Sequence, residues 1–384
     1  MKTNLHSQIR HNWFVETDKP IERSTLRAVV NLALLTAKPI LKLTNKDYRD
    51  NGLETLLSIY DSAYNLNIKV FNALQHTITG WPGGKPLADD SNRPERALPY
   101  PKRVVVFSPH PDDDVISMGG TLQRLVNQGH DVHVAYQVSG NIAVSDEDAL
   151  RYILLMDAVA GLWGFDTSHF RKRNDEIKNF IELKQRNGGQ DTTDLRYVKT
   201  MIRQGEARIA CSYVGVKSKN IHFLNLPFYE TGEVKKGDLT DKDIAIVKDL
   251  LSDIRPHQIF VAGDLADPHG THKVCLDAVF AAVEQSRDEL WLRDCRVWMY
   301  RGAWAEWDID QIDMVVPLSP EELMSKRIAI LKHQSQMENA PFLGDDDRLF
   351  WQRAEDRNRA TAQLYAQLGL ASYEAMEAFA RYQL

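Results

Sequence analysis

Short runs of β-branched and apolar residues alternate with longer amphipathic segments along the last three quarters of the chain. The runs at 104–108, 132–138 and 259–262 are too short for helices and have the composition of buried strands. The segments at 115–128 and about 272–285 repeat apolar residues at helical spacing. Such alternation predicts parallel βαβ units.

The same pattern continues elsewhere in this part of the chain. It predicts further strands at 221–226, 295–300 and 314–318, helices from about 146 and over 244–254, and two C-terminal helical stretches. The segment 171–194 differs, because it is dense in charge and has too little apolar content for a core element. We expect an excursion or a mobile flap there. The predicted fold class is α/β: a Rossmann-like, mostly parallel β-sheet flanked by helices.

The N-terminal region has a different pattern. Apolar residues at mixed helical spacing predict a mostly helical structure, and the stretch GWPGGKPLADDSNRPERALPYPK then collects prolines, glycines and charges without any apolar period. We therefore predict a helical N-terminal appendage over 1–79, a linker over 80–102 and an α/β domain with C-terminal helices over 103–384.

Composition and charge narrow the classes of partner. The 384 residues carry a formal net charge of -6, so the chain as a whole has no electrostatic reason to bind nucleic acid. The most apolar stretch, 28–37, is bounded by charged residues and predicts no membrane span. The N-terminal residues lack the apolar stretch of a secretory signal, which predicts a cytoplasmic location. We expect a small-molecule partner, and a homo-oligomer stays open.

The three cysteines are odd in number and have no CxxC spacing. This fits neither a disulfide framework nor a zinc ribbon, so we expect them to be reduced packing residues.

The strand at 104–108 runs directly into a loop crowded with titratable groups. His110 is followed by Asp112, Asp113 and Asp114, just before the next predicted helix. Open α/β sheets bind ligands beyond the carboxyl ends of their strands, and a divalent cation would neutralise three adjacent carboxylates. Helix capping is an alternative for one or two of the aspartates, but it explains neither His110 nor the prolines on both sides of it.

A second cluster, DPHGTHK, follows the buried strand at 259–262 and contains His269 and His272. Imidazoles are common zinc ligands, although two histidines alone are a weak signal. Because both clusters follow predicted parallel strands, we expect them to meet at one rim of the sheet.

These residues resemble the LmbE-like or PIG-L family of zinc-dependent N-acetyl sugar deacetylases. The resemblance covers about 102–336. The strand followed by PHPDDD and a glycine pair is similar to the family's PHPDDE signature, His269 and His272 to its later His-x-x-His pair, and the HQSQ sequence that begins at His333 to its HxSQ element.

Carried over position by position, the resemblance implies that His110, Asp113 and His272 bind Zn²⁺ and that Asp112 is the general base. It also implies that His269 stabilises the oxyanion or donates a proton. The expected reaction removes an acetyl group from an N-acetylated amino sugar through a zinc-activated water. Two imidazoles and one carboxylate agree with a catalytic zinc site, which keeps one position open.

Further residues are candidates for substrate contact. Arg203, with Glu206, resembles the family's Arg-x-x-Glu helix, in which the arginine reaches the substrate; a solvated helix pair is the alternative. Ser139 and Asn141 follow the strand at 132–138 and could line the same rim. Three tryptophans, Trp298, Trp304 and Trp307, are interpreted as packing residues, with an aromatic face for a sugar ring as the alternative. The glycine pair is interpreted as a close contact of a helix with the sheet.

Two departures from the family pattern favour a second hypothesis. Asp114 stands where the family usually has glutamate, and HGTH replaces the commoner HPDH. A sugar- or metal-binding module without turnover is therefore an alternative to the enzyme, and another divalent ion is an alternative to zinc.

The N-terminal region carries one more resemblance. PILKLTNKDY and NIKVFNALQHTITGWPGGKP are similar to the tail and linker of bacterial proteins that join a glucosamine-6-phosphate deaminase-like domain to an LmbE-like domain. No deaminase core is recognised in the chain, so we expect a separated module or a fragment. Sugar-phosphate deamination is the third functional hypothesis.

Overall fold

A computed structural model describes residues 21–87, 98–165, 168–187, 189–231, 236–263, 270–302, 305–337 and 348–384. Its centre is a seven-stranded sheet with the strand order β3-β2-β1-β4-β5-β7-β6. The strands are β1 (Arg103–Ser108), β2 (Asp131–Tyr136), β3 (Ile221–Phe223), β4 (Gln258–Ala262), β5 (Arg296–Tyr300), β6 (Met314–Leu318) and β7 (Ala375–Tyr382). All neighbouring pairs among β1 to β5 are parallel, whereas β7 pairs antiparallel with both β5 and β6.

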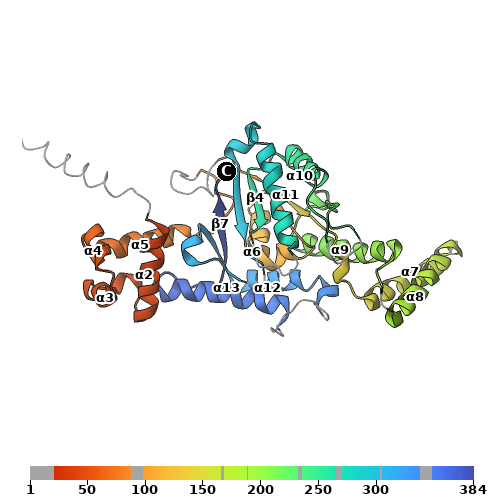
Figure 1. The fold of residues 1–384 in the computed structure, drawn as a ribbon, viewed down its shortest axis with the longest axis horizontal. Helices are drawn as coiled ribbons and strands as arrows, with labels where there is room; N and C mark the ends of the chain where they lie inside the picture. The colour runs from red at the N-terminus through yellow and green to blue at the C-terminus, as the bar shows by residue number, and fades with distance from the viewer. Residues whose placement is uncertain are drawn as a thin grey trace, which may run out of the picture.

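Helices cover both faces of the sheet (Figure 1). The α-helices of the described chain are α2 (Arg23–Thr36), α3 (Asn45–Asp50), α4 (Glu54–Tyr60), α5 (Ala63–Thr77), α6 (Asp113–Asn127), α7 (Asp146–Leu162), α8 (Ser168–Asn187), α9 (Thr193–Tyr213), α10 (Asp241–Ile254), α11 (Thr271–Gln285), α12 (Pro320–Ile330) and α13 (Phe350–Gln367). Short 3₁₀ helices include η3 (Asn141–Ala143), η5 (Leu290–Asp294), η6 (Ile309–Gln311) and η7 (Gln334–Gln336).

Successive side chains of a strand point to opposite faces of the sheet, which explains the layered architecture. Val104 and Val106 of β1 pack into a core with α6, α9 and α12, while Val105 and Phe107 pack into a separate core with α10 and α11. A strand with apolar residues on both faces must be covered on both sides. The α/β fold with a mostly parallel sheet is thus confirmed.

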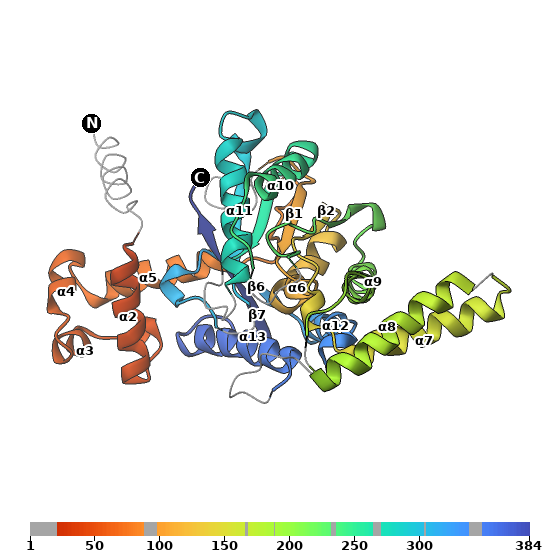
Figure 2. The same ribbon diagram turned by 45° about the vertical axis from the view of Figure 1, so that its right-hand side comes forward.

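The N-terminal helices α2 to α5 pack together at one end of the molecule (Figure 2). Their buried residues, such as Val29 and Leu66, share a hydrophobic cluster with Val315 of β6 and Tyr365 of α13. The predicted helical character of this region is confirmed, whereas the boundaries at 79 and 102 stay predictions.

Two parts of the fold differ from the sequence-based expectations. Residues 375–382 form the antiparallel strand β7 between β5 and β6, which the sequence pattern did not predict, and the predicted strand at 221–226 ends at Phe223. Most of the charged segment 171–194 is helical, in α8 and the start of α9. The expected excursion is confirmed, because α7 and α8 project from the body as a hairpin (Figure 2).

No helix among the described residues is both long enough and apolar enough to cross a bilayer. The three cysteines are buried and none of them forms a disulfide within the described part of the chain, as expected.

Candidate active site

The described residues of the two predicted clusters lie beyond the carboxyl ends of β1 and β4, which are neighbours in the sheet. His110 is in the loop that follows β1, and Asp113 begins α6. His272 is in the first turn of α11, on the chain that follows β4. Strand order reverses at this point, since β1 lies between β2 and β4. Such a switch point forms the ligand crevice of open α/β sheets.

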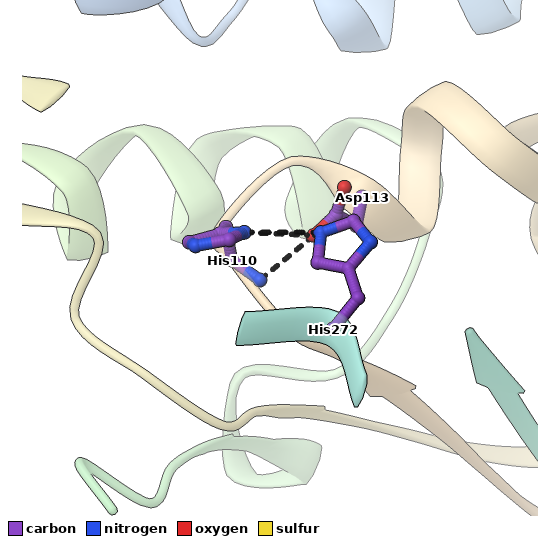
Figure 3. Close-up of side chains that lie close together, drawn as sticks. All are labelled: His110, Asp113 and His272. Carbon is purple, nitrogen blue, oxygen red and sulfur yellow. Dashed lines mark hydrogen bonds and ion pairs between the residues drawn. The ribbon is translucent and has the colours of Figure 1, made fainter. Parts of the chain in front are cut away.

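Side chains of His110, Asp113 and His272 converge on one point (Figure 3). Asp113 Oδ2 lies 3.3 Å from His110 Nδ1 and 3.2 Å from His272 Nε2, and the two nitrogens are 3.3 Å apart. An ion in tetrahedral coordination, with bonds of 2.0–2.1 Å, separates its ligand atoms by about 3.3 Å. The nearly equilateral triangle of donor atoms therefore fits a metal ion of this kind.

The backbone also orients Asp113. The backbone N–H of His110 donates to Asp113 Oδ2 at 2.8 Å, which holds the carboxylate toward the imidazoles. Burial alone would raise the pKa of Asp113, but the nearby His272 and His110 hold this pKa well below its usual range. The carboxylate is thus kept ionised, as a metal ligand must be.

Asp112 lies beside the triad and is only 6% exposed. One of its carboxylate oxygens is 3.3 Å from Arg203 Nη2, and the same nitrogen donates to the backbone oxygen of Pro111 at 2.9 Å. Burial raises the pKa of Asp112 in spite of the opposing effect of Arg203. Asp112 makes no capping hydrogen bond to α6, so helix capping does not explain its position.

Asp114 points away from the triad into the core. It accepts hydrogen bonds from Ser108 Oγ at 3.2 Å and Tyr136 Oη at 3.0 Å. Burial raises the pKa of its carboxyl group to about 7. Only two of the three consecutive aspartates therefore face the candidate site.

Arg203 is fully buried, so its interpretation as part of a solvated helix pair is wrong. Glu206, one turn further along α9, accepts hydrogen bonds from the backbone and hydroxyl of Ser335, both at 2.7 Å. His333 is also completely buried, and burial lowers its pKa to about 3. The HQSQ segment is thus joined to α9, the helix whose Arg203 contacts Asp112.

Ser139 and Asn141 are buried in the turn that follows β2. Glu230, which was not predicted as a site residue, accepts hydrogen bonds from the Ser139 backbone N–H at 3.2 Å and the Asn141 amide at 3.4 Å. The ring of the adjacent Tyr229 lies 6.1 Å from that of His110, edge to face. Residues after β3 therefore contribute to the same rim of the sheet.

Some predicted residues lie elsewhere. His269 and Trp304 are outside the described residues. Trp298 is buried in the core beneath the sheet, and Trp307 donates its indole N–H to the backbone oxygen of Met299. Gly120 allows a close approach, because a β-carbon there would lie 2.5 Å from the Leu318 side chain. These positions agree with packing roles for Trp298 and Gly120.

Comparison with known families identifies a match over the part of the chain that contains this site. Residues 105–283 match the family model PIG-L, described as GlcNAc-PI de-N-acetylase. This part of the chain is therefore similar to the PIG-L family. The matched region includes the loop after β1 and the start of α11, and thus all three residues of the triad.

A curated protein of Bacteroides thetaiotaomicron, named as glucosamine-6-phosphate deaminase-like, is 60% identical over 381 residues. The match covers 98% of this chain, and the chain spans 57% of the relative's length.

Solved structures similar to this chain include N,N'-diacetylchitobiose deacetylase from Pyrococcus horikoshii, at 18% identity and a TM-score of 0.47. That match covers 73% of this chain and 84% of the other. The 4-carboxy-2-hydroxymuconate hydratase GalB of Pseudomonas putida matches at 17% identity and a TM-score of 0.47, over 74% and 97% of the two chains.

Proposed function

We propose that the chain is a metal-dependent deacetylase that removes an acetyl group from an N-acetylated amino sugar. The observation that carries the proposal is the convergence of His110, Asp113 and His272 within the region that matches the PIG-L family model. The family description names a de-N-acetylase of a GlcNAc group, which supports an N-acetylated sugar as the substrate class.

His110, Asp113 and His272 are the proposed metal ligands. Two imidazoles and one carboxylate suit zinc, although they also bind other first-row ions. When bound, such an ion supplies Lewis acidity toward a carbonyl oxygen and toward water. We propose Zn²⁺ as the metal.

Asp112 is the proposed general base. Its buried carboxylate lies beside Asp113, and burial raises its pKa, which makes it a better proton acceptor. Asp112 takes a proton from water as the water oxygen bonds to the acetyl carbon. The C–N bond then breaks, the nitrogen gains a proton, and acetate and an amine leave.

The remaining roles are proposed from the family resemblance. His269 stabilises the negative charge on the acetyl oxygen or donates the proton to the departing amine. Arg203, which contacts Asp112, and Ser139 and Asn141, which line the turn after β2, bind the sugar.

Acetate release tests the proposal. Purified protein loaded with Zn²⁺ should release acetate from at least one member of a panel of N-acetylglucosamine derivatives with free, phosphorylated and glycosidic anomeric positions. Asp112→Asn should abolish release but retain the metal, since Asp112 is not one of the three converging ligands. Asp277→Asn, in an exposed ion pair with Lys273, is the matched control and should leave the rate unchanged.

The same assay separates the alternatives. A binding module without turnover would hold metal and release no acetate from any substrate. The name of the Bacteroides relative favours a test of deamination as well. Ammonia release from glucosamine 6-phosphate would support that third hypothesis, and we expect none.

A further inference from the structure

The hairpin formed by α7 and α8, here called the arm, projects from the body on the side away from the N-terminal helices (Figure 2). A small hydrophobic cluster joins the arm to α9. Ala149 and Ile153 of α7, Ile177 of α8 and Leu195 of α9 are among its buried members. One face of α7 is therefore covered within the chain.

A second apolar face of α7 remains uncovered. Tyr152, Leu155, Met156, Val159 and Trp163 recur at intervals of three and four residues, so they lie on one side of the helix. The exposed fractions are 36% for Tyr152, 57% for Leu155, 41% for Met156 and 69% for Trp163. We call this set the α7 stripe. A helix of an isolated soluble protein normally turns polar residues outward at such positions.

Charged residues interrupt α7 without interrupting the stripe. Between Ala149 and Trp163 the helix contains Arg151 and Asp157. Arg151 pairs with Asp148 at 3.0 Å, and Asp157 pairs with Arg171 of α8 at 3.3 Å. Both ion pairs are made within the arm, so each of these two charges is already paired there.

The base of the stripe borders a groove of about 520 Å³ between α7 and α9. Its lining includes Tyr152 and Met156 of α7 and Tyr197, Met201 and Ile209 of α9. The α9 residues are also exposed, at 64%, 40% and 59%. A mainly apolar hollow thus lies at one end of the stripe.

The other end of the stripe carries protruding side chains. Leu162 is 82% exposed and Phe165 is 64% exposed, and the ring of Phe165 packs edge to face against Trp163. From Tyr152 to Trp163 the helix rises by roughly 16 Å. The arm therefore has an apolar protrusion at its tip and an apolar hollow at its base.

We propose that the arm pairs antiparallel with the arm of a second copy of this chain. A two-fold axis near the middle of the stripe would place the tip of each arm in the groove of the other. The protruding tip of each chain then fills the hollow of the other, which gives the two identical contacts that a self-complementary two-fold interface requires. The four paired helices form a bundle, with the two stripes as its core.

The exposed apolar area is large enough for an interface with a second copy of the chain. The stripe, the tip and the α9 residues together expose on the order of 1,000 Å² of apolar side chain, and a standard stable interface buries about 800 Å² on each partner. A contiguous apolar patch of this size is unusual on a monomer. The proposed surface does not include the metal triad, so its test does not depend on catalysis.

Solution mass tests the proposal. Wild-type protein at micromolar concentration should show about twice the chain mass of 43.8 kDa by light scattering. Leu155→Glu places a charge at the centre of the stripe and should give the mass of a single chain. Leu290→Glu changes a residue that is 72% exposed in η5, outside the arm, and should leave the dimer intact. Circular dichroism should show equal helix content in all three proteins.

Cross-linking tests the geometry. Val159 lies near the proposed axis, so Val159→Cys should form a disulfide-linked dimer under mild oxidation, whereas Leu290→Cys should not. The native cysteines are buried and should not contribute.

Three outcomes would overturn the proposal: wild-type protein that stays monomeric at high micromolar concentration, equal dissociation of the Leu155→Glu and Leu290→Glu proteins, or a dimer in which Val159→Cys does not cross-link. Sedimentation of monomeric protein with phosphatidylcholine and phosphatidylglycerol vesicles, lost in Leu155→Glu, would assign the stripe to lipid instead.

Discussion

The rim of the sheet and the arm depart from ordinary burial in opposite directions. At the rim, Asp112, Asp113 and His272 are buried polar groups, whereas the arm exposes Leu155 and Trp163 to solvent. Buried charge and exposed large apolar groups both oppose stability when nothing else binds them. The comparison teaches that each region is adapted to a partner outside the chain: a cation at the rim and an apolar protein surface at the arm.

The largest expected effect is at the rim. Asp113→Asn removes the negative charge that both imidazoles face, and we expect bound metal and acetate release to fall by about a hundredfold or more. Asp157→Asn removes a carboxylate of the same size from the arm, where it makes an exposed ion pair. Metal content by mass spectrometry and the acetate rate should be unchanged in this control. If Asp113→Asn retained metal and rate, the triad would not be the metal site.

Local sequence signals predict the rim because strand ends and polar clusters coincide there. The run Val104–Ser108 leads directly to His110 and Asp113, and the run at 259–262 is followed ten positions later by His272. The parallel sheet then brings the two clusters together. The same rule, applied to the residues that follow the predicted strand at 221–226, would have identified Tyr229 and Glu230.

The C-terminal strand could not be found in this way. Residues 375–380 include alanine, methionine and glutamate, which favour helices. They form β7 because β5 and β6 pair with it on either side and both of its faces are buried. Long-range pairing overrides local preference here. In the arm, α8 is charged along most of its length, yet it contributes Ile177 and Ile181 to a buried hydrophobic cluster.

We expect a smaller effect, on stability, when the buried ion pair in the core behind the rim is broken. Lys326 Nζ lies 2.7 Å from Glu377 Oε1, and both side chains are fully buried. Glu377 also accepts from the backbone N–H and hydroxyl of Thr121 in α6. Glu377→Gln leaves the Lys326 charge uncompensated, so we expect the free energy of unfolding to fall by about 3 kcal/mol in urea titrations.

A double variant distinguishes charge from packing in this core. Lys326→Met combined with Glu377→Gln removes the unpaired charge and should recover part of the lost stability. A loss below about 1 kcal/mol in Glu377→Gln alone would show that the buried pair does not stabilise the region behind the rim.

The smallest effect is expected at the base of the arm, where two lysines share the same two carboxylates in largely buried ion pairs. Lys199 Nζ lies 2.6 Å from Asp146 and 2.8 Å from Asp191, while Lys184 also contacts both carboxylates. Because Lys184 remains in Lys199→Met, we expect only a roughly tenfold increase in amide exchange of α7 and α8, with global unfolding little changed.

The pH dependence of this amide exchange tests whether Lys199 acts through its charge on Asp191. Burial alone would raise the pKa of Asp191, but hydrogen bonds from Lys184 and Lys199 lower it below its usual value. A carboxyl group whose pKa is lower in the folded state stabilises that state fully above its unfolded pKa of about 4, and this contribution is lost as the pH falls through the folded pKa. The difference between wild type and Lys199→Met should therefore be complete at neutral pH and shrink below pH 4. A difference that is the same at both pH values would mean that Lys199 supports the arm through its methylene chain and not through its charge.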